Sequence, residues 1–409
     1  MIPIIPQSSS ASDTSSLVVP LFNRPGAIQI TTQLPLSLYI HWPWCVRKCP
    51  YCDFNSHEDK ESASEDQYID ALITDLELSL PLIWGRRIHT IFFGGGTPSL
   101  ISAAGLERLL SAVRARVTVE ANAEITLEAN PGTFELEKFL GFKAAGVNRL
   151  SLGIQSFNTQ HLKALGRIHD AQEAQAAAQF AIETFENCNL DLMFALPGQT
   201  LEQCAHDVTA VLSFAAPHIS LYHLTIEPNT YFHRYPPEIP DDDLAFAMQD
   251  MIGERLDQAG YQHYEVSAYA KPGQQARHNL NYWQFGDYLG IGAGAHSKLS
   301  FPHRIVRQMR FKQPQAYVAG INQQQPVQEE FEVSAADLPF EFMLNALRLT
   351  NGFAMTDWAE RTGLSLSVIQ KQLDEAEKRG LIYRNHQKVV PTVQGQRFLN
   401  DLQMLFLRE

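Results

Sequence analysis

Three cysteines close together in the chain carry the clearest chemical signal. Cys45, Cys49 and Cys52 follow the first predicted strand with the spacing CxxxCxxC. Three thiolates at this spacing can bind three corners of a cubane [4Fe–4S] cluster, which leaves the fourth iron without a protein ligand and open to a small molecule. The alternative is a structural zinc ion with His41 or His57 as the fourth ligand. Structural zinc ligands usually come as two pairs, and the sequence has no second pair, so it favours the cluster.

Composition narrows the class of protein and its compartment. The chain has 409 residues, which allows two or three domains, and 45% hydrophobic with 19% charged residues is typical of a globular protein. Cysteines are few, and Cys188 and Cys204 are isolated, which indicates reduced thiols and a cytoplasmic location rather than a disulfide framework. The formal net charge of −13 gives no electrostatic support for binding nucleic acid or anionic lipid. No apolar run is long enough for direct membrane insertion.

The elements that must position the cysteines follow a regular pattern. From Leu36 on, short apolar runs alternate with amphipathic helical patterns, which is typical of βα units that build a parallel sheet. About six such units predict an α/β fold with a partial (β/α)6 barrel, open on one side, whose functional groups lie on the loops after the strands. The predicted strands are 36–42, 89–95, 125–130, 149–156, 190–197 and 219–227.

Changes in composition divide the chain into five predicted segments. The first contains SSSASDTSS and a single arginine, Arg24, and has the pattern of neither a signal peptide nor a transit peptide. In the last, the would-be recognition helix balances acidic against basic residues, which disfavours DNA binding. The segments are a disordered extension (1–34), the barrel (35–240), an accessory α+β region with the motif HNLNYW (241–312), a linker (313–338) and a winged-helix-like domain (339–409).

The cysteine motif, on the loop after the first strand, resembles that of the radical S-adenosylmethionine (SAM) superfamily. The resemblance implies that the open iron binds the amino and carboxylate groups of SAM, and that one-electron reduction cleaves SAM to a 5′-deoxyadenosyl radical. Two further motifs agree with it. FGGGTP (93–98) has glycines that let the backbone approach a ligand closely, and Glu128 in LEANP is placed to accept hydrogen bonds from an amino or hydroxyl group.

Several strings resemble one branch of this superfamily, the coproporphyrinogen III oxidase-like proteins, over residues 35–400. They are YIHWPWC, FFGGGTPS, LEANP, LGIQSFN, LGRIHD and LDLMFALPGQT. The resemblance implies that the cluster-bound SAM contacts Tyr39, Gly95, Gly96, Thr97 and Glu128. It also implies that a second SAM or the substrate contacts Gln155, Arg167 and Asp191. For Gln155 and Asp191 the alternative is ordinary hydrogen bonding inside the barrel mouth.

One position and one motif separate two subgroups of this branch. The oxidative enzymes carry a further cysteine two residues after the motif, where this chain has Phe54. HNLNYW resembles the HNxxYW signature of HemW-type haem chaperones. A neutral imidazole is a good axial ligand for haem iron, and Tyr282 and Trp283 offer flat apolar faces to a porphyrin. The alternative is a buried structural histidine beside two packing aromatics.

The resemblance therefore predicts a haem chaperone that holds haem as cargo through His278. It implies haem-accepting proteins as partners, respiratory cytochromes among them, and leaves open whether the chain forms a homodimer. No catalytic residue is assigned. The alternatives are an oxygen-independent coproporphyrinogen III oxidase, which is an enzyme of haem biosynthesis, and a zinc-stabilised binding module.

Overall fold

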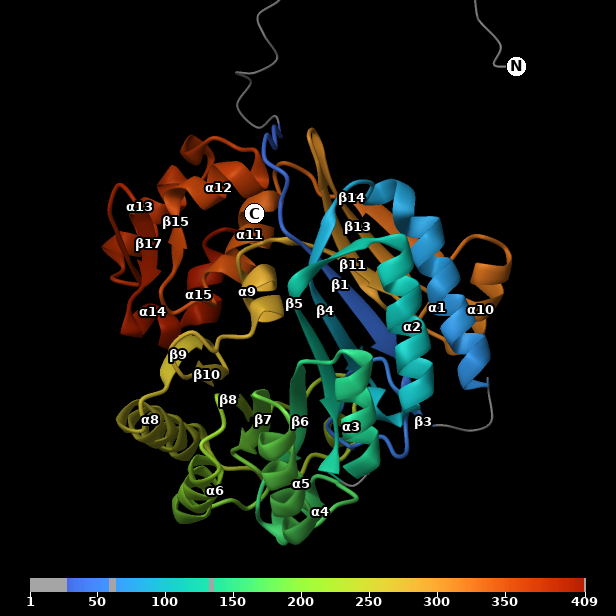
Figure 1. Ribbon diagram of the computed structural model, residues 1–409. Coiled ribbons are helices and arrows are strands. Elements are labelled where there is room, and N and C mark those ends of the chain that lie inside the picture. Colours follow the sequence, from blue (N-terminus) through green and yellow to red (C-terminus); the bar gives the residue numbers. More distant parts are fainter. Residues whose placement is uncertain (1–27, 59–63, 132–135, 408–409) are drawn as a thin grey trace, which may run out of the picture.

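The computed structural model describes residues 28–58, 64–131 and 136–407, and a twelve-stranded sheet runs through its centre (Figure 1). Six neighbouring strands of this sheet are parallel and follow the order of the chain, which confirms the α/β fold predicted from the alternating pattern. They are β1 (Leu36–Trp42), β4 (Arg87–Gly95), β5 (Thr118–Ala129), β6 (Arg149–Gln155), β7 (Asn187–Phe194) and β8 (His218–His223).

Further strands extend the sheet on both sides and leave the barrel open. On one side β11 (Asp287–Ile291) pairs with β1 in parallel. The antiparallel strands that follow it are β12 (His296–Phe301), β13 (Arg304–Arg310) and β14 (Val327–Glu332). On the other side β8 pairs with β10 (Ala268–Ala270), and β10 pairs with β9 (Gln262–Glu265). Within the described residues β14 and β9 end the strand order and do not pair, so the predicted partial barrel is confirmed.

Helices cover the outer face of the sheet, as Figure 1 shows for α1, α2, α3 and α5. Most of them begin at a loop side chain that accepts a backbone hydrogen bond, among them Ser64, Ser102, Asp170 and Thr200. These caps fix where each loop ends and its helix begins. The helices are α1 (Glu65–Ser79), α2 (Ala103–Arg116), α3 (Leu136–Ala145), α4 (Thr159–Ala164), α5 (Ala171–Thr184), α6 (Leu201–Ser213) and α7 (Tyr231–Arg234), with single 3-10 turns at Leu80–Leu82 and Pro98–Leu100.

The main core lies between the sheet and these helices. Parallel strands with helices on one face and the barrel interior on the other are buried on both sides, which explains their nearly continuous apolar runs. Leu38, Leu127 and Leu190 have no exposed surface. The first predicted helical stripe also packs here, with Ile69 and Leu72 fully buried.

The region after the barrel adds to the same sheet. Helix α8 (Asp242–Gln258) begins at Asp241, which caps it as expected, and α9 (Arg277–Trp283) holds HNLNYW. The predicted linker over 313–338 is wrong, because this stretch forms α10 (Pro314–Asn322) and strand β14. Its prolines and glutamines favoured a loop, but proline is tolerated at the start of a helix, and Tyr317 anchors α10 in the core.

The C-terminal residues form a smaller unit with its own core around the fully buried Trp358, beside the barrel (Figure 1). Its three strands pair in the order β15–β17–β16. Its elements are α11 (Leu338–Ala346), β15 (Phe353–Ala354), α12 (Met355–Thr362), a 3-10 turn (Leu366–Val368), α13 (Gln370–Lys378), β16 (Ile382–Arg384), β17 (Lys388–Pro391), α14 (Val393–Arg397) and α15 (Leu399–Met404).

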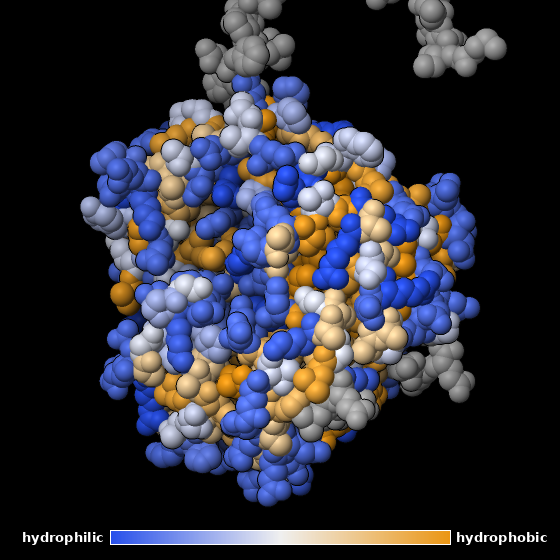
Figure 2. All heavy atoms as spheres, viewed as in Figure 1, coloured by the Kyte–Doolittle hydropathy of each residue, from blue (hydrophilic) through white to orange (hydrophobic). Residues whose placement is uncertain are grey.

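The predicted disordered extension, residues 1–34, lies outside the described residues up to residue 27. Residues 28–34 are not disordered, because Ile30 is buried in the C-terminal core and its N–H donates to the carbonyl of Pro302. No helix among the described residues is both long and apolar enough to span a membrane. Figure 2 shows hydrophilic residues spread over the whole visible face, with apolar residues between them.

Candidate functional site

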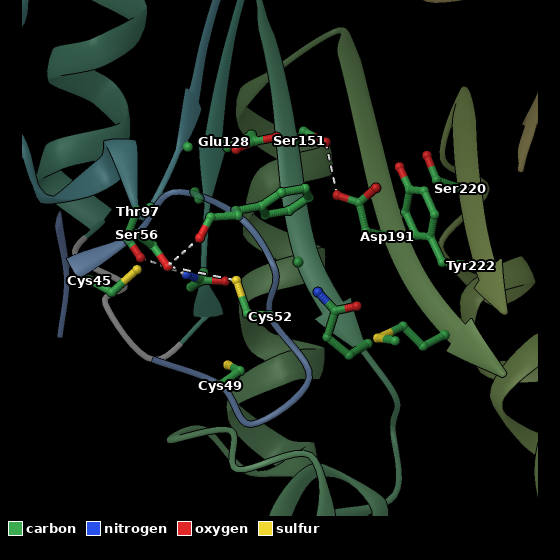
Figure 3. Close-up of a pocket in the computed structure, with 18 of the residues that line it drawn as sticks. Cys45, Cys49, Cys52, Ser56, Thr97, Glu128, Ser151, Asp191, Ser220 and Tyr222 are labelled. Carbon is green, nitrogen blue, oxygen red and sulfur yellow. Dashed lines mark hydrogen bonds between the residues drawn. The ribbon is translucent and has the colours of Figure 1, made fainter. Parts of the chain in front are cut away.

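The three cysteines lie on the loop that leaves β1, at the edge where the parallel strands end. The short strands β2 (Trp44–Cys45) and β3 (His57–Glu58) pair with each other and bracket this loop. It opens on a cavity of about 420 Å³ inside the barrel, hereafter the first cavity, which all three cysteines line. Figure 3 shows the cysteines on one side of this cavity and Asp191 on the other.

Polar groups surround the thiols closely. Nη1 of Arg167 lies 3.7 Å from Sγ of Cys49, and Oγ of Ser56 lies 3.7 Å from Sγ of Cys52. Burial raises the pKa of the Cys45 and Cys52 thiols, while a hydrogen bond from Thr97 lowers that of Cys45. Since a metal ligand must be the thiolate, the guanidinium and the hydroxyls are donors that favour the form a cluster requires.

The donor set fits an iron–sulfur cluster better than a zinc ion. Among the described residues no three His, Cys, Asp or Glu side chains converge as the ligands of a single metal ion must. His41, one of the two candidates for a fourth zinc ligand, has both ring nitrogens in use, with Nδ1 2.9 Å from the Tyr39 hydroxyl and Nε2 2.8 Å from the Asn55 carbonyl. A cubane separates its corner irons and needs only three thiolates on one loop, which this chain supplies.

The glycines after β4 pack directly against the cysteine loop. The N–H groups of Gly96 and Thr97 donate to the carbonyls of Trp42 and Trp44, both at 2.7 Å. A Cβ on Gly96 would lie 2.5 Å from the Trp44 carbonyl oxygen, and Gly95 has a positive φ of 118°. These glycines are therefore needed to seat the cysteine loop, whatever ligand they also contact.

Two carboxyl groups face the barrel interior. Burial, followed by the charge of Asp191, raises the pKa of Glu128 to about 8. Burial likewise raises the pKa of Asp191, although Ser151 donates to one of its oxygens at 2.9 Å and Asn189 to the other at 2.7 Å. A cationic ligand beside the two groups would lower both pKa values and favour the ionised carboxylates. The pair therefore suits an ammonium or sulfonium group.

The remaining residues that were predicted to contact SAM or the substrate line two adjoining cavities. Nη2 of Arg167 donates to the Gly153 carbonyl at 2.8 Å, and Gln155 has a positive φ of 67°, which is uncommon outside glycine. Tyr39 lines a second cavity of about 780 Å³ instead, which shares the wall around Phe92 and Glu128 with the first. The first cavity is lined by Cys45, Cys49, Cys52, Gly95, Gly96, Thr97, Glu128, Gln155, Arg167, Asp191 and His278.

Side chains of the HNLNYW helix line both cavities. His278 lines the first, whereas Tyr282 and Trp283 line the second together with the basic side chains of Lys48 and Lys312. The motif therefore does not present its histidine and its two aromatic rings to one cavity. Tyr282 lies one helical turn beyond His278, with ring centroids 6.5 Å apart, so the boundary between the cavities passes between neighbouring rings on the helix.

His278 is held by a carboxylate that the sequence analysis missed. Its Nδ1 lies 2.7 Å from Oε1 of Glu124, and the N–H groups of Arg277 and His278 each donate to the same carboxylate at 3.0 Å. The ring stacks on Phe92 with centroids 4.3 Å apart. Burial opposes the charge of Glu124, but the donation from His278 outweighs it and holds the pKa of Glu124 below its usual range. An acid just before the apolar run ITLEAN was the only signal in the sequence.

The raised pKa of Glu128 predicts a pH-dependent stability. The folded protein retains this proton between pH 4.5 and about 8 while the unfolded chain loses it, so stability falls as pH rises through that window. Glu128→Gln removes the ionisation. At pH ~8.5 we expect this variant to increase the free energy of unfolding of the ligand-free protein by a few kcal/mol (order of magnitude), and so to raise its thermal midpoint. At pH ~5 we expect the thermal midpoint to change little.

Thermal unfolding monitored by circular dichroism at both pH values measures this effect. Glu107→Gln, at an exposed position on α2, is the matched control and should keep the pH dependence of the wild type. Equal pH dependence in Glu128→Gln and the wild type would show that Glu128 ionises normally.

Comparisons with known proteins agree with this geometry. Residues 39–210 match the family model of the radical SAM superfamily, and residues 333–398 match that of the HemN C-terminal domain. Two proteins named heme chaperone HemW, from Escherichia coli and Haemophilus influenzae, are each 48% identical over 92% of this chain and over 99% and 98% of their own lengths. One of the same name from Bacillus subtilis is 34% identical over 91% of the chain and 99% of its own length.

A solved structure has the same fold. It is the coproporphyrinogen III oxidase HemN from Escherichia coli, described as a radical SAM enzyme. The match has a TM-score of 0.78 at 24% identity and covers 91% of this chain and 90% of that one.

Proposed function

Because the chain belongs to the radical SAM superfamily and, within it, to the HemW heme chaperone family, we propose that it binds haem and transfers it to acceptor proteins. One observation carries this proposal. The cysteine loop and the motif histidine, more than 200 residues apart in the chain, line the same cavity in the barrel. The residues proposed to hold a cluster and to bind haem therefore share one chamber.

Cys45, Cys49 and Cys52 would hold a [4Fe–4S] cluster, as the superfamily implies. When bound, the cluster supplies an electron and an open iron for the amino and carboxylate groups of SAM. The chain contributes the surroundings. Thr97 and Ser56 donate to the thiolates, and Glu128 offers a carboxylate to an ammonium group.

The other predicted SAM or substrate contacts are proposed on their position in the same cavity. All three line the first cavity: Gln155 ends β6, Asp191 lies within β7, and Arg167 lies between α4 and α5. Together they provide an amide, a guanidinium and a carboxylate, which suit a polar ligand that carries both signs of charge. Tyr39 contacts the same region from the second cavity, since it packs on Phe92 with ring centroids 6.0 Å apart.

His278 is the proposed ligand of the haem iron. Because Nδ1 donates its proton to Glu124, the neutral ring carries its lone pair on Nε2, the atom that then remains to bind iron. A carboxylate behind a ligating histidine orients the ring and makes it a stronger donor. Glu124 and the stacked Phe92 thus hold His278 in one orientation before the cargo arrives.

Phe54 favours a chaperone over a decarboxylating enzyme. The oxidative branch has a cysteine at this position, whereas Phe54 is 63% exposed and lines both cavities. A large exposed apolar ring offers no ligand to a metal, but it gives a porphyrin an apolar contact.

The proposed acceptors are haem proteins, respiratory cytochromes among them. With a net charge of −13 the chain would reach a membrane-bound acceptor through that protein and not through lipid charge. We place it in the cytoplasm, where its five unpaired cysteines stay reduced.

Anaerobic reconstitution followed by parallel titrations with haem and with coproporphyrinogen tests the proposal. We expect saturable haem binding, haem transfer to an added apocytochrome, and no turnover of coproporphyrinogen. Decarboxylated product at a useful rate would establish the oxidase instead. A colourless protein with one zinc per chain would establish the zinc-stabilised module.

A further inference from the structure

Arg149 is a buried cation for which the described residues supply no ion-pair partner. It begins β6, is 2% exposed and lines the first cavity. Its Nε has no hydrogen-bond partner, and no ion pair joins its guanidinium to a carboxylate of the described residues. Arg310 is also buried, but its guanidinium has partners, since it donates to Asp75 at 3.0 Å and to Ser79 at 2.9 Å.

The two carboxylates on which the charge of Arg149 acts accept hydrogen bonds from other donors. Glu124 accepts from Nδ1 of His278 and from two backbone N–H groups of α9. Asp191 accepts from Ser151 and Asn189. The charge of Arg149 lowers the pKa of both acids, so it lies close enough to be felt, yet neither acid forms a pair with it.

An isolated guanidinium in a protein interior is unfavourable, because it has lost its hydration and gained no partner. Such a group is retained where a ligand supplies the missing partner. Guanidinium matches a carboxylate best, since two parallel N–H donors meet its two oxygens. The first cavity, at about 420 Å³, is within the size range of small-molecule sites.

We propose that Arg149 binds a carboxylate of the ligand in the first cavity, and that this ligand is the carboxylate-bearing tetrapyrrole cargo. The identity of the ligand rests on the proposed function. The methionyl carboxylate of SAM is the other source of the same chemistry. Arg149 begins β6 and Gln155 ends it, which separates their Cα atoms by about 20 Å at ~3.3 Å per residue. Arg149 therefore lies at the end of β6 that is farther from the cysteine loop, on the side of Glu124 and His278.

Two variants test this inference. Arg149→Met removes the charge and keeps an apolar stem, and Arg149→Lys keeps the charge without the paired donors. Arg379→Met, at an exposed position beyond α13, is the control. Reconstituted proteins are titrated with ferric haem, with haem dimethyl ester, with SAM and with decarboxylated SAM, and the thermal midpoint of each ligand-free variant is recorded.

We expect Arg149→Met to bind haem about 10- to 100-fold more weakly and Arg149→Lys to lie between it and the wild type. Both should bind haem dimethyl ester and SAM as the wild type does. The thermal midpoint of ligand-free Arg149→Met should stay equal or rise, because an unpaired buried charge has been removed.

Three results would overturn the inference. They are unchanged haem affinity in Arg149→Met, weakened binding of SAM but not of haem, and a lower thermal midpoint with equal losses for haem and its diester, which would show a structural role. Each of these three results can be obtained only if the wild type binds haem. If the wild type binds none, the proposed function itself fails.

Discussion

Replacing Cys45, Cys49 or Cys52 with alanine is expected to abolish the iron–sulfur cluster. Each variant keeps only two of the three thiolates on the loop, and His41 cannot substitute for the third, since its ring nitrogens are held by Tyr39 and Asn55. Anaerobically reconstituted variants should lose the broad visible absorption of the cluster and nearly all of the about four irons per chain that the wild type binds.

Cys188→Ala and Cys204→Ala are the matched controls. Both thiols are buried in the main core away from the first cavity, and burial raises the pKa of each to about 12, so they stay protonated. These variants should be slightly less stable and keep full iron content. Wild-type iron and sulfide in any of the three loop variants would contradict the assignment of ligands.

His278→Ala is expected to change haem binding while leaving the cluster intact. Loss of the ring nitrogen that would bind the iron should alter the Soret band and weaken haem affinity by at least about tenfold. Removing only a group that hydrogen-bonds to a metal ligand already costs about this much at metal sites. Glu124 is left without its side-chain donor, so the variant should also be less stable. Haem titration followed by absorption, with iron analysis in parallel, separates the two effects.

Two other histidines serve as controls. His303→Ala changes an exposed residue that lines neither described cavity, and should behave as the wild type. His296→Ala changes a residue of the second cavity. If His278→Ala keeps the wild-type haem spectrum and His296→Ala loses it, the second cavity holds the cargo and the assignment of His278 is wrong.

The arrangement of the sheet could be predicted because its signal is local. Each parallel strand is a short apolar run followed by a capped amphipathic helix, and both patterns are visible within a few residues. All six predicted barrel strands are present, and the cysteine loop follows the first of them. The position of the loops after the strands then brings distant motifs to one cavity without further information.

The polar interior of the barrel could not be predicted in the same way. Glu124 and His278 are 154 residues apart, and nothing local marks the acid as the partner of the histidine. Arg149 looks like an ordinary polar residue at the start of a strand until the register of β5 and β6 places it inside the barrel. The linker prediction failed for a related reason, because Tyr317 stabilises α10 through contacts with α1 that the surrounding glutamines do not reveal.

We propose that the three thiolates leave one iron of the cluster open to SAM. Electron paramagnetic resonance of the anaerobically reconstituted and reduced protein tests it most directly, with and without added SAM. We expect a [4Fe–4S]⁺ signal whose g values change when SAM is added. A protein without iron and sulfide after reconstitution, or a spectrum that SAM leaves unchanged, would contradict it.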